Sequence, residues 1–232
     1  MKKFCADDWG MSPSINDAIL DLIENKLIYS VSIIIGGKYV DYRLRELLLL
    51  QKTNEVKLSL HFNLTYKHEF RSPIQVLIAY ALRRINYSSV RKELLNQIKI
   101  AESKEIHFDM IDGHHHIHLL PFVFKVINQN VDKININAIR VMNDILHFTS
   151  YSVSLMVSIL FKKELKNWIL IDCGYLLASD LKSNESIASK TKKFERLIIH
   201  PAKYYDFDKV DFSDSLKEQR ILEFQKIMEY CH

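Results

Sequence analysis

The sequence predicts an α/β fold in which short parallel strands alternate with helices, as in a (β/α) barrel. Apolar runs of strand length alternate with segments of helical periodicity along the chain, which is the pattern of βαβ units. Several of these runs end in polar side chains capable of chemistry, as barrel strands do at their carboxyl ends. The 232 residues, 48% hydrophobic and 26% charged, suffice for one buried core. We therefore expect a single domain over residues 1–232.

The expected strands follow from short apolar runs that stop at polar or glycine residues. They lie at residues 3–6, 31–35, 56–64, around Ile111, 138–141, 168–172 and 197–199. The expected helices follow from apolar residues at helical spacing, the first of them capped by Ser12 or Ser14. They lie at about 12–25, around Leu44, Leu47 and Leu48, and at about 90–101, 148–161 and 215–230.

Two segments need separate treatment. Residues 65–90 fit the alternation least well, and we expect them to form a lid or excursion over the site. Residues 148–161 are the most apolar stretch, but they are too few to span a bilayer and contain several serines. We expect a buried helix there.

Charge and cysteine content exclude several classes of protein. Thirty-two basic residues are nearly balanced by 28 acidic ones, and no arginine-rich stripe is present, so nucleic acid is not an expected partner. The three cysteines are too sparse for a disulfide framework or a CxxC zinc pattern. No apolar signal core follows the first residues, so we expect a cytoplasmic protein without a transmembrane segment. A homodimer is compatible with the sequence.

The strongest clue is the run Asp112-Gly113-His114-His115-His116-Ile117-His118, which holds four of the ten histidines. Imidazole is the commonest side-chain metal ligand and the usual proton carrier near neutral pH. In an extended chain Asp112, His114, His116 and His118 would share one face. In a helix His114 and His118 would share one side instead. Either arrangement favours a metal site over a solvated loop, and Asp112 could orient a ligating ring.

Three other segments carry candidate residues that are weak when taken singly. Asp7 and Asp8 end the first strand, where a turn before Gly10 would let both carboxylates reach one site, although such a pair more often serves turn chemistry. His61 lies in an apolar alternating run and, alone, is more often a core residue than a ligand. His200 follows the last strand and, alone, is more often a strand-end residue with a backbone hydrogen bond.

Together these segments predict a site for acid–base hydrolysis. One carboxylate and two imidazoles can hold a metal ion that polarises a carbonyl and lowers the pKa of bound water. A second carboxylate can take the proton of that water, and a separate histidine can protonate the leaving amine.

The four segments resemble motifs of the YdjC/ChbG-type carbohydrate deacetylases. Ala6-Asp7-Asp8-Trp9-Gly10-Met11-Ser12 is similar to the family's Ala-Asp-Asp-Phe-Gly-Leu-Ser opening, and Leu60-His61-Phe62-Asn63-Leu64-Thr65 to its Leu-His-hydrophobic-Asn-Leu-Thr segment. Residues 112–118 are similar to its Asp-(Ser/Gly)-His-His-His-Val-His signature. Ile199-His200-Pro201 resembles its closing His-Pro-Gly. The motifs occur in order over nearly the whole chain.

The resemblance implies an irregular TIM-like (β/α) barrel that hydrolyses the N-acetyl group of an N-acetylated amino sugar, either an oligosaccharide or a glycolipid. It implies one divalent ion, Mg²⁺ or Zn²⁺, held by Asp8, His61 and His114. By the same carry-over Asp7 is the general base and His200 the general acid. The remaining candidates support the site or face the substrate. They are Asp112, His116, His118 and Arg140.

Two other functions use the same residues. A metal-dependent phosphoesterase would need the same ligands, but no glycine-rich phosphate loop is visible. A non-catalytic metal- or sugar-binding protein would not need Asp7 and His200, both of which are present.

Overall fold

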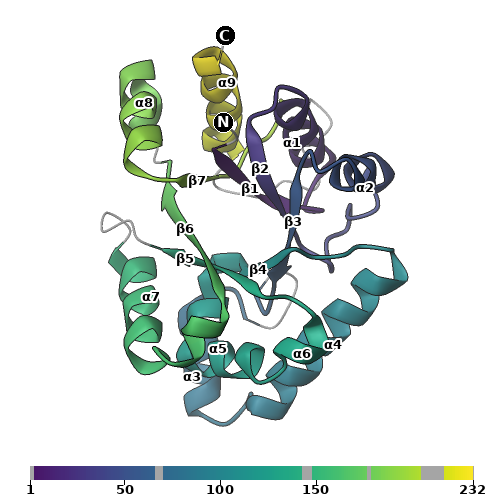
Figure 1. Ribbon diagram of the computed structural model, residues 1–232, viewed down its shortest axis with the longest axis vertical. Coiled ribbons are helices and arrows are strands. Elements are labelled where there is room, and N and C mark those ends of the chain that lie inside the picture. The colour runs from purple at the N-terminus through teal and green to yellow at the C-terminus, as the bar shows by residue number, and fades with distance from the viewer. Residues whose placement is uncertain (1–2, 66–69, 143–147, 177–178, 205–216, 232) are drawn as a thin grey trace. The chain divides into compact units, whose positions relative to one another are not determined.

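The structure is a computed structural model that describes residues 3–65, 70–142, 148–176, 179–204 and 217–231 (Figure 1). Its strands follow one another in chain order around a closed barrel. Their bounds are β1 (Phe4–Trp9), β2 (Ile28–Ile33), β3 (Lys57–Phe62), β4 (Met110–Gly113), β5 (Ala138–Met142), β6 (Ile169–Tyr175) and β7 (Arg196–Ile199). The pairings β1–β2, β1–β7, β3–β4, β4–β5 and β6–β7 are parallel. The predicted barrel of alternating strands and helices is therefore confirmed.

The helices among the described residues fill the connections between the strands. They are α1 (Pro13–Glu24), α2 (Leu44–Lys52), α3 (Pro73–Ala81), α4 (Tyr87–Ser103), α5 (Pro121–Asn128), α6 (Val131–Ile134), α7 (Phe148–Leu160), α8 (Asn184–Lys193) and α9 (Lys217–Cys231). Short 3₁₀ segments are η1 (His114–Leu119), η2 (Glu164–Asn167) and η3 (Asp180–Lys182). Helices α1 and α3 begin alike, with a serine cap at Ser12 or Ser72 and a proline in the first turn. Proline fits this position because an amide N–H in the first turn has no acceptor within the helix.

The chain divides into two compact units. The first comprises Met1–Ile33, Gly37–Leu58 and Asp172–His232. Strand β1 is buried along its whole length in this unit and pairs with β2 and β7. Helix α8 packs against β7 and α9.

The second unit comprises Ile34–Gly36 and Ser59–Ile171. Strands β3, β4 and β5 pair in order within it. Helix α5 packs against α4, α7 and η1, and its Val123, Phe124 and Ile127 are fully buried.

Two expectations about local structure need correction, and the lid over residues 65–90 stays a prediction. That segment contains helix α3, while its residues 66–69 lie outside the described part. Strand β1 extends to Trp9, beyond the predicted end at residue 6. Helix α7 is not simply buried, because Leu155, Met156, Ile159 and Leu160 face solvent. None of the described helices combines the length and the hydropathy that crossing a bilayer requires.

Candidate active site

A bulge in β1 presents the two adjacent carboxylates. Ala6 lies opposite Val31 and Trp9 opposite Ile33, so β1 has one residue more than β2 between these pairs. Asp8 occupies the left-handed region with φ 73°, a conformation that aspartate tolerates better than most residues. The side chains of Asp7 and Asp8 are both buried. The predicted turn at a strand end is therefore an irregularity within the strand.

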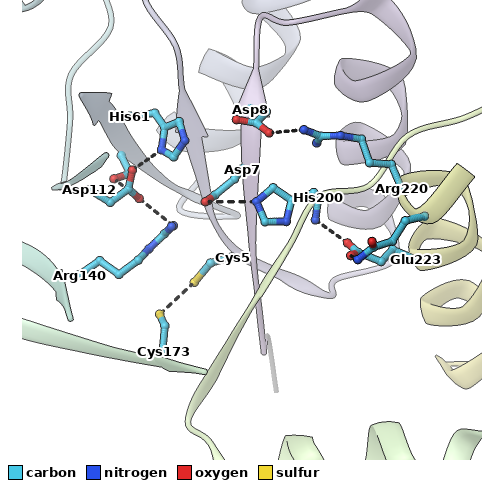
Figure 2. Close-up of polar contacts among 12 residues, drawn as sticks. Cys5, Asp7, Asp8, His61, Asp112, Arg140, Cys173, His200, Arg220 and Glu223 are labelled. Carbon is cyan, nitrogen blue, oxygen red and sulfur yellow. Dashed lines mark hydrogen bonds and ion pairs between the residues drawn. The ribbon is translucent and has the colours of Figure 1, made fainter. Parts of the chain in front are cut away.

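Helix α9 supplies the partner of Asp8. The guanidinium Nη2 of Arg220 lies 2.6 Å from Asp8 Oδ2 (Figure 2). Both side chains are almost completely buried, at 4% and 2% exposure, so the charge of each is balanced away from water.

His200 lies beside Asp7 because β7 runs next to β1. Cys5 pairs with Ile198 and Ala6 with Ile199, and His200 Nε2 lies 4.0 Å from Asp7 Oδ2. The ring of His200 is partly open, with 30% of the side chain exposed. A half-exposed imidazole next to a buried carboxylate is suited to proton transfer.

Glu223 of α9 fixes the backbone at His200. Its Oε2 accepts the amide N–H of His200 at 2.6 Å (Figure 2). Burial raises the pKa of Glu223 to about 7, although the His200 amide and Arg220 favour its charged form. The amide of Ala202 also donates to the carbonyl of Arg220. Helix α9 therefore contacts β1 through Arg220 and the chain after β7 through Glu223.

In the second unit, strand pairing brings His61 and Asp112 together. The two residues are direct neighbours in the β3–β4 ladder, and His61 Nδ1 lies 2.6 Å from Asp112 Oδ1. Ser59 donates its hydroxyl to Asp112 Oδ2, and Arg140 Nη2 lies 2.7 Å from the same oxygen. Because an ionised carboxylate only accepts, His61 carries its proton on Nδ1 and the lone pair on Nε2.

Segment η1 places His114 next to His61. The centroids of the two rings lie 5.4 Å apart in an edge-to-face arrangement. The next two residues, His115 and His116, take left-handed dihedrals inside η1. The run is therefore neither the extended strand nor the α-helix that the sequence offered as alternatives. His115 is exposed and bonds Thr65 through Nδ1, and His116 is partly buried.

His118 supports the site by holding the backbone at Arg140. It is fully buried, and its Nε2 bonds the carbonyl oxygen of Arg140 at 3.0 Å. Burial lowers the pKa of His118 to about 4, so the ring is neutral at physiological pH and donates through Nε2. Gly113 is required for this packing, because a Cβ there would lie 3.0 Å from His118 Nδ1. His118 therefore holds the Arg140 backbone and does not face solvent.

Arg220 and Glu223 were not among the residues predicted from the sequence. They lie on a helix at the far end of the chain, and Arg220 is 212 positions from Asp8. Nothing in the local sequence distinguishes these two charged residues from the exposed ones of the same helix.

The described residues include aspartate and histidine groups that could hold a metal ion. The first unit contributes the carboxylates of Asp7 and Asp8, and the second unit contributes His61, Asp112 and His114.

Comparison with known proteins identifies the family. A family model described as YdjC-like protein matches residues 3–232. The chain belongs to this family. The YdjC-like chain is 26% identical over 153 residues to a carbohydrate deacetylase of Xenopus laevis, a match that covers 58% of the chain. The chain thus spans about half, 48%, of the length of that curated relative.

A solved structure shares the fold of this YdjC-like chain. It is a proposed cellobiose-phosphate cleavage protein from Enterococcus faecalis, with a TM-score of 0.72 and 16% sequence identity. The match covers 100% of this chain and 96% of the other. At that identity the likeness establishes the fold only.

Proposed function

We propose that this protein is a metal-dependent hydrolase that removes the N-acetyl group from an N-acetylated amino sugar. Membership in the YdjC-like family and similarity to a carbohydrate deacetylase support this activity. The observation that carries the proposal is the buried pair Asp7 and Asp8 with the imidazole of His200 at 4.0 Å from Asp7. A hydrolase in which one carboxylate acts as the general base and another binds the metal ion needs two carboxylates at the site.

Asp8, His61 and His114 are the residues we assign to a divalent ion. Arg220 binds Asp8 Oδ2, and we assign the other oxygen, Oδ1, to the ion. His61 would use Nε2, since Asp112 holds Nδ1. The donor chemistry fits a divalent ion, and two imidazoles with one carboxylate suit Zn²⁺ better than Mg²⁺. When bound, the ion would polarise the acetyl carbonyl and lower the pKa of water.

Asp7 and His200 perform the proton transfers in this proposal. The carboxylate of Asp7 takes a proton from water as the water oxygen attacks the acetyl carbon. Protonated His200 then gives its proton to the sugar nitrogen as the C–N bond breaks, which yields acetate and a free amine. Glu223 keeps His200 in register with Asp7 through the backbone amide of His200.

An acetate-release assay tests the proposal directly. The wild-type protein, loaded with Zn²⁺ or Mg²⁺, should release acetate from N-acetylglucosamine oligomers or from an N-acetylated glycolipid. Asp7→Asn should lower the rate by about 10²–10⁴-fold, the usual contribution of a general base, while metal binding by equilibrium dialysis stays unchanged. Asp21→Asn, on α1 and paired with Lys203, is the control.

Two results would refute the assignment. If Asp7→Asn hydrolyses at the wild-type rate, Asp7 is not the base. If the folded, metal-loaded wild-type protein releases no acetate from any of these sugars but cleaves phosphate esters in a phosphatase screen, the protein is a phosphoesterase.

A further inference from the structure

Helix α3 turns apolar side chains toward solvent. Ile74, Leu77, Ile78 and Leu82 follow the spacing i, i+3, i+4 and i+8, so they form one stripe of the helix. Their exposed fractions run from 40% to 66%. The opposite side of α3 is buried through smaller residues, Val76 and Ala79.

Helix α7 has the same inverted pattern. Leu155, Met156, Ile159 and Leu160 form a stripe whose exposed fractions run from 45% to 69%. Val157 of the same helix is buried. We call the eight exposed side chains of α3 and α7 the apolar face.

Both helices belong to the second unit and pack on the same elements. Tyr80 of α3 stacks on Phe122 of α5 with ring centroids 3.9 Å apart. Phe161, just after α7, packs on Phe124 of α5 at 5.0 Å. Both α3 and α7 also contact η1, the segment that begins with His114. Helices α3 and α7 therefore both pack against the segment that bears a proposed metal ligand.

The charged residues that first follow the two helices are basic. Neither helix contains an acidic residue, and each is followed by an exposed basic pair, Arg83-Arg84 after α3 and Lys162-Lys163 after α7, with Glu164 next in the chain after the second pair. A cavity of about 270 Å³ lies beside α3. Its lining residues are Phe70, Gln75, Ile78, Ala79 and Arg84.

We propose that this surface docks on an anionic phospholipid bilayer. Exposed apolar stripes bordered by lysine and arginine are the pattern of helices that lie in a membrane interface. The apolar side chains would enter the acyl boundary, and the basic pairs would meet headgroup phosphates. A second copy of the chain fits less well, because the same two helices of that copy offer no acidic side chain to meet the basic pairs, whereas an anionic bilayer offers phosphates. Docking of this kind is separate from the proposed reaction and does not depend on it.

Vesicle co-sedimentation tests the docking. The protein should sediment with vesicles of phosphatidylcholine mixed with phosphatidylglycerol, and less with phosphatidylcholine alone. Two double variants test the two contributions: Ile74→Ser with Ile159→Ser removes inserted apolar side chains, and Arg83→Glu with Arg84→Glu reverses the basic charge. Each should lower the partition coefficient by about tenfold or more, because inserted apolar side chains and basic residues near the surface both contribute to binding.

Matched controls come from α2 of the first unit, where Leu49 and Arg45 are exposed. Leu49→Ser and Arg45→Glu should bind vesicles as the wild type does. All variants should keep the wild-type thermal midpoint and the wild-type rate of acetate release from a soluble N-acetylglucosamine oligomer. This second measurement separates a failure of docking from a failure of the proposed reaction.

Three outcomes would overturn the docking proposal. The wild-type protein fails to sediment with either kind of vesicle. The α2 variants lose binding as strongly as those of α3 and α7. Sedimentation velocity shows a dimer that Ile74→Ser with Ile159→Ser dissociates, in which case a second copy covers the apolar face.

Discussion

In the first unit a buried cation holds the carboxylate of Asp8, whereas in the second unit a buried anion holds the imidazole of His61. Arg220 neutralises Asp8 directly at 2.6 Å. Asp112 fixes the His61 ring at the same distance, and the charge of Asp112 is in turn balanced by Arg140. Asp8 and His61 are thus each oriented by a buried charged group, but the sign of that group's charge is reversed between them.

The two arrangements also differ in how the chain brings them together. Asp112 reaches His61 through a strand pairing, so the geometry follows from the β3–β4 ladder. Arg220 reaches Asp8 only when α9 packs within the first unit, because the two residues are 212 positions apart in sequence. The orientation of His61 therefore depends on strand pairing, whereas that of Asp8 depends on the packing of a helix.

The largest effect is expected when the anion of the second unit is neutralised. Asp112→Asn keeps the shape of the side chain but removes the negative charge that lies 2.7 Å from the buried guanidinium of Arg140. We expect the free energy of unfolding to fall by about 3–5 kcal/mol, as for a buried ion pair that loses one member. Urea unfolding at neutral pH would measure the change from the midpoint and slope.

Asp132→Asn is the matched control in the same unit, because Asp132 is exposed on α6. A change within about 0.5 kcal/mol is expected there. Equal effects of the two substitutions would show that Asp112 does not hold a buried charge.

A smaller loss is expected when the cation of the first unit is removed. Arg220→Met keeps the apolar stem and leaves Asp8 without its guanidinium partner, so we expect a loss of about 2–4 kcal/mol in the absence of added metal. Lys226→Met is a control on the same helix, since Lys226 pairs with Glu229 at 2.6 Å in a solvent-exposed position. That pair should contribute less than about 1 kcal/mol. If both substitutions cost the same, burial does not distinguish the two ion pairs.

Most of the barrel could be predicted from the sequence, because its strands are buried and a buried strand is a short run of apolar residues. The sequence also predicted that Asp7 and Asp8 could serve one site, although through a turn and not through the bulge in β1. The geometry of η1 was not predictable, since the left-handed dihedrals of His115 and His116 reflect their tertiary surroundings and not a local propensity. Arg220 was missed for a related reason, because a buried arginine and an exposed one look alike in a helical pattern.

The two units should respond to pH in opposite directions, and Glu223 tests the first. Its pKa in the folded protein is raised to about 7, so its stabilising contribution is present below the unfolded value and is lost as pH rises toward and through 7. Glu223→Gln can still accept the His200 amide but does not titrate. Between pH 5 and pH 8 the wild type should lose on the order of 2–3 kcal/mol relative to this variant.

Urea midpoints at a series of pH values would measure that difference, with the exposed Glu218→Gln on the same helix as control. Parallel pH curves for wild type and Glu223→Gln would contradict a protonated Glu223 in the folded state.

His118 tests the second unit with the smallest expected effect. Its pKa in the folded protein is lowered to about 4, so the stability it contributes is present above the unfolded value near 6.5 and is lost as pH falls toward 4. His118→Gln keeps a donor for the Arg140 carbonyl and removes the titration. From pH 7 to pH 5 the wild type should lose about 2 kcal/mol relative to the variant, measured again by urea unfolding. His107→Gln, outside η1 and more exposed, should leave the curve of the wild type unchanged. A wild-type curve that rises on acidification relative to His118→Gln would mean that the ring is charged in the folded protein, and the contrast between the two units would then disappear.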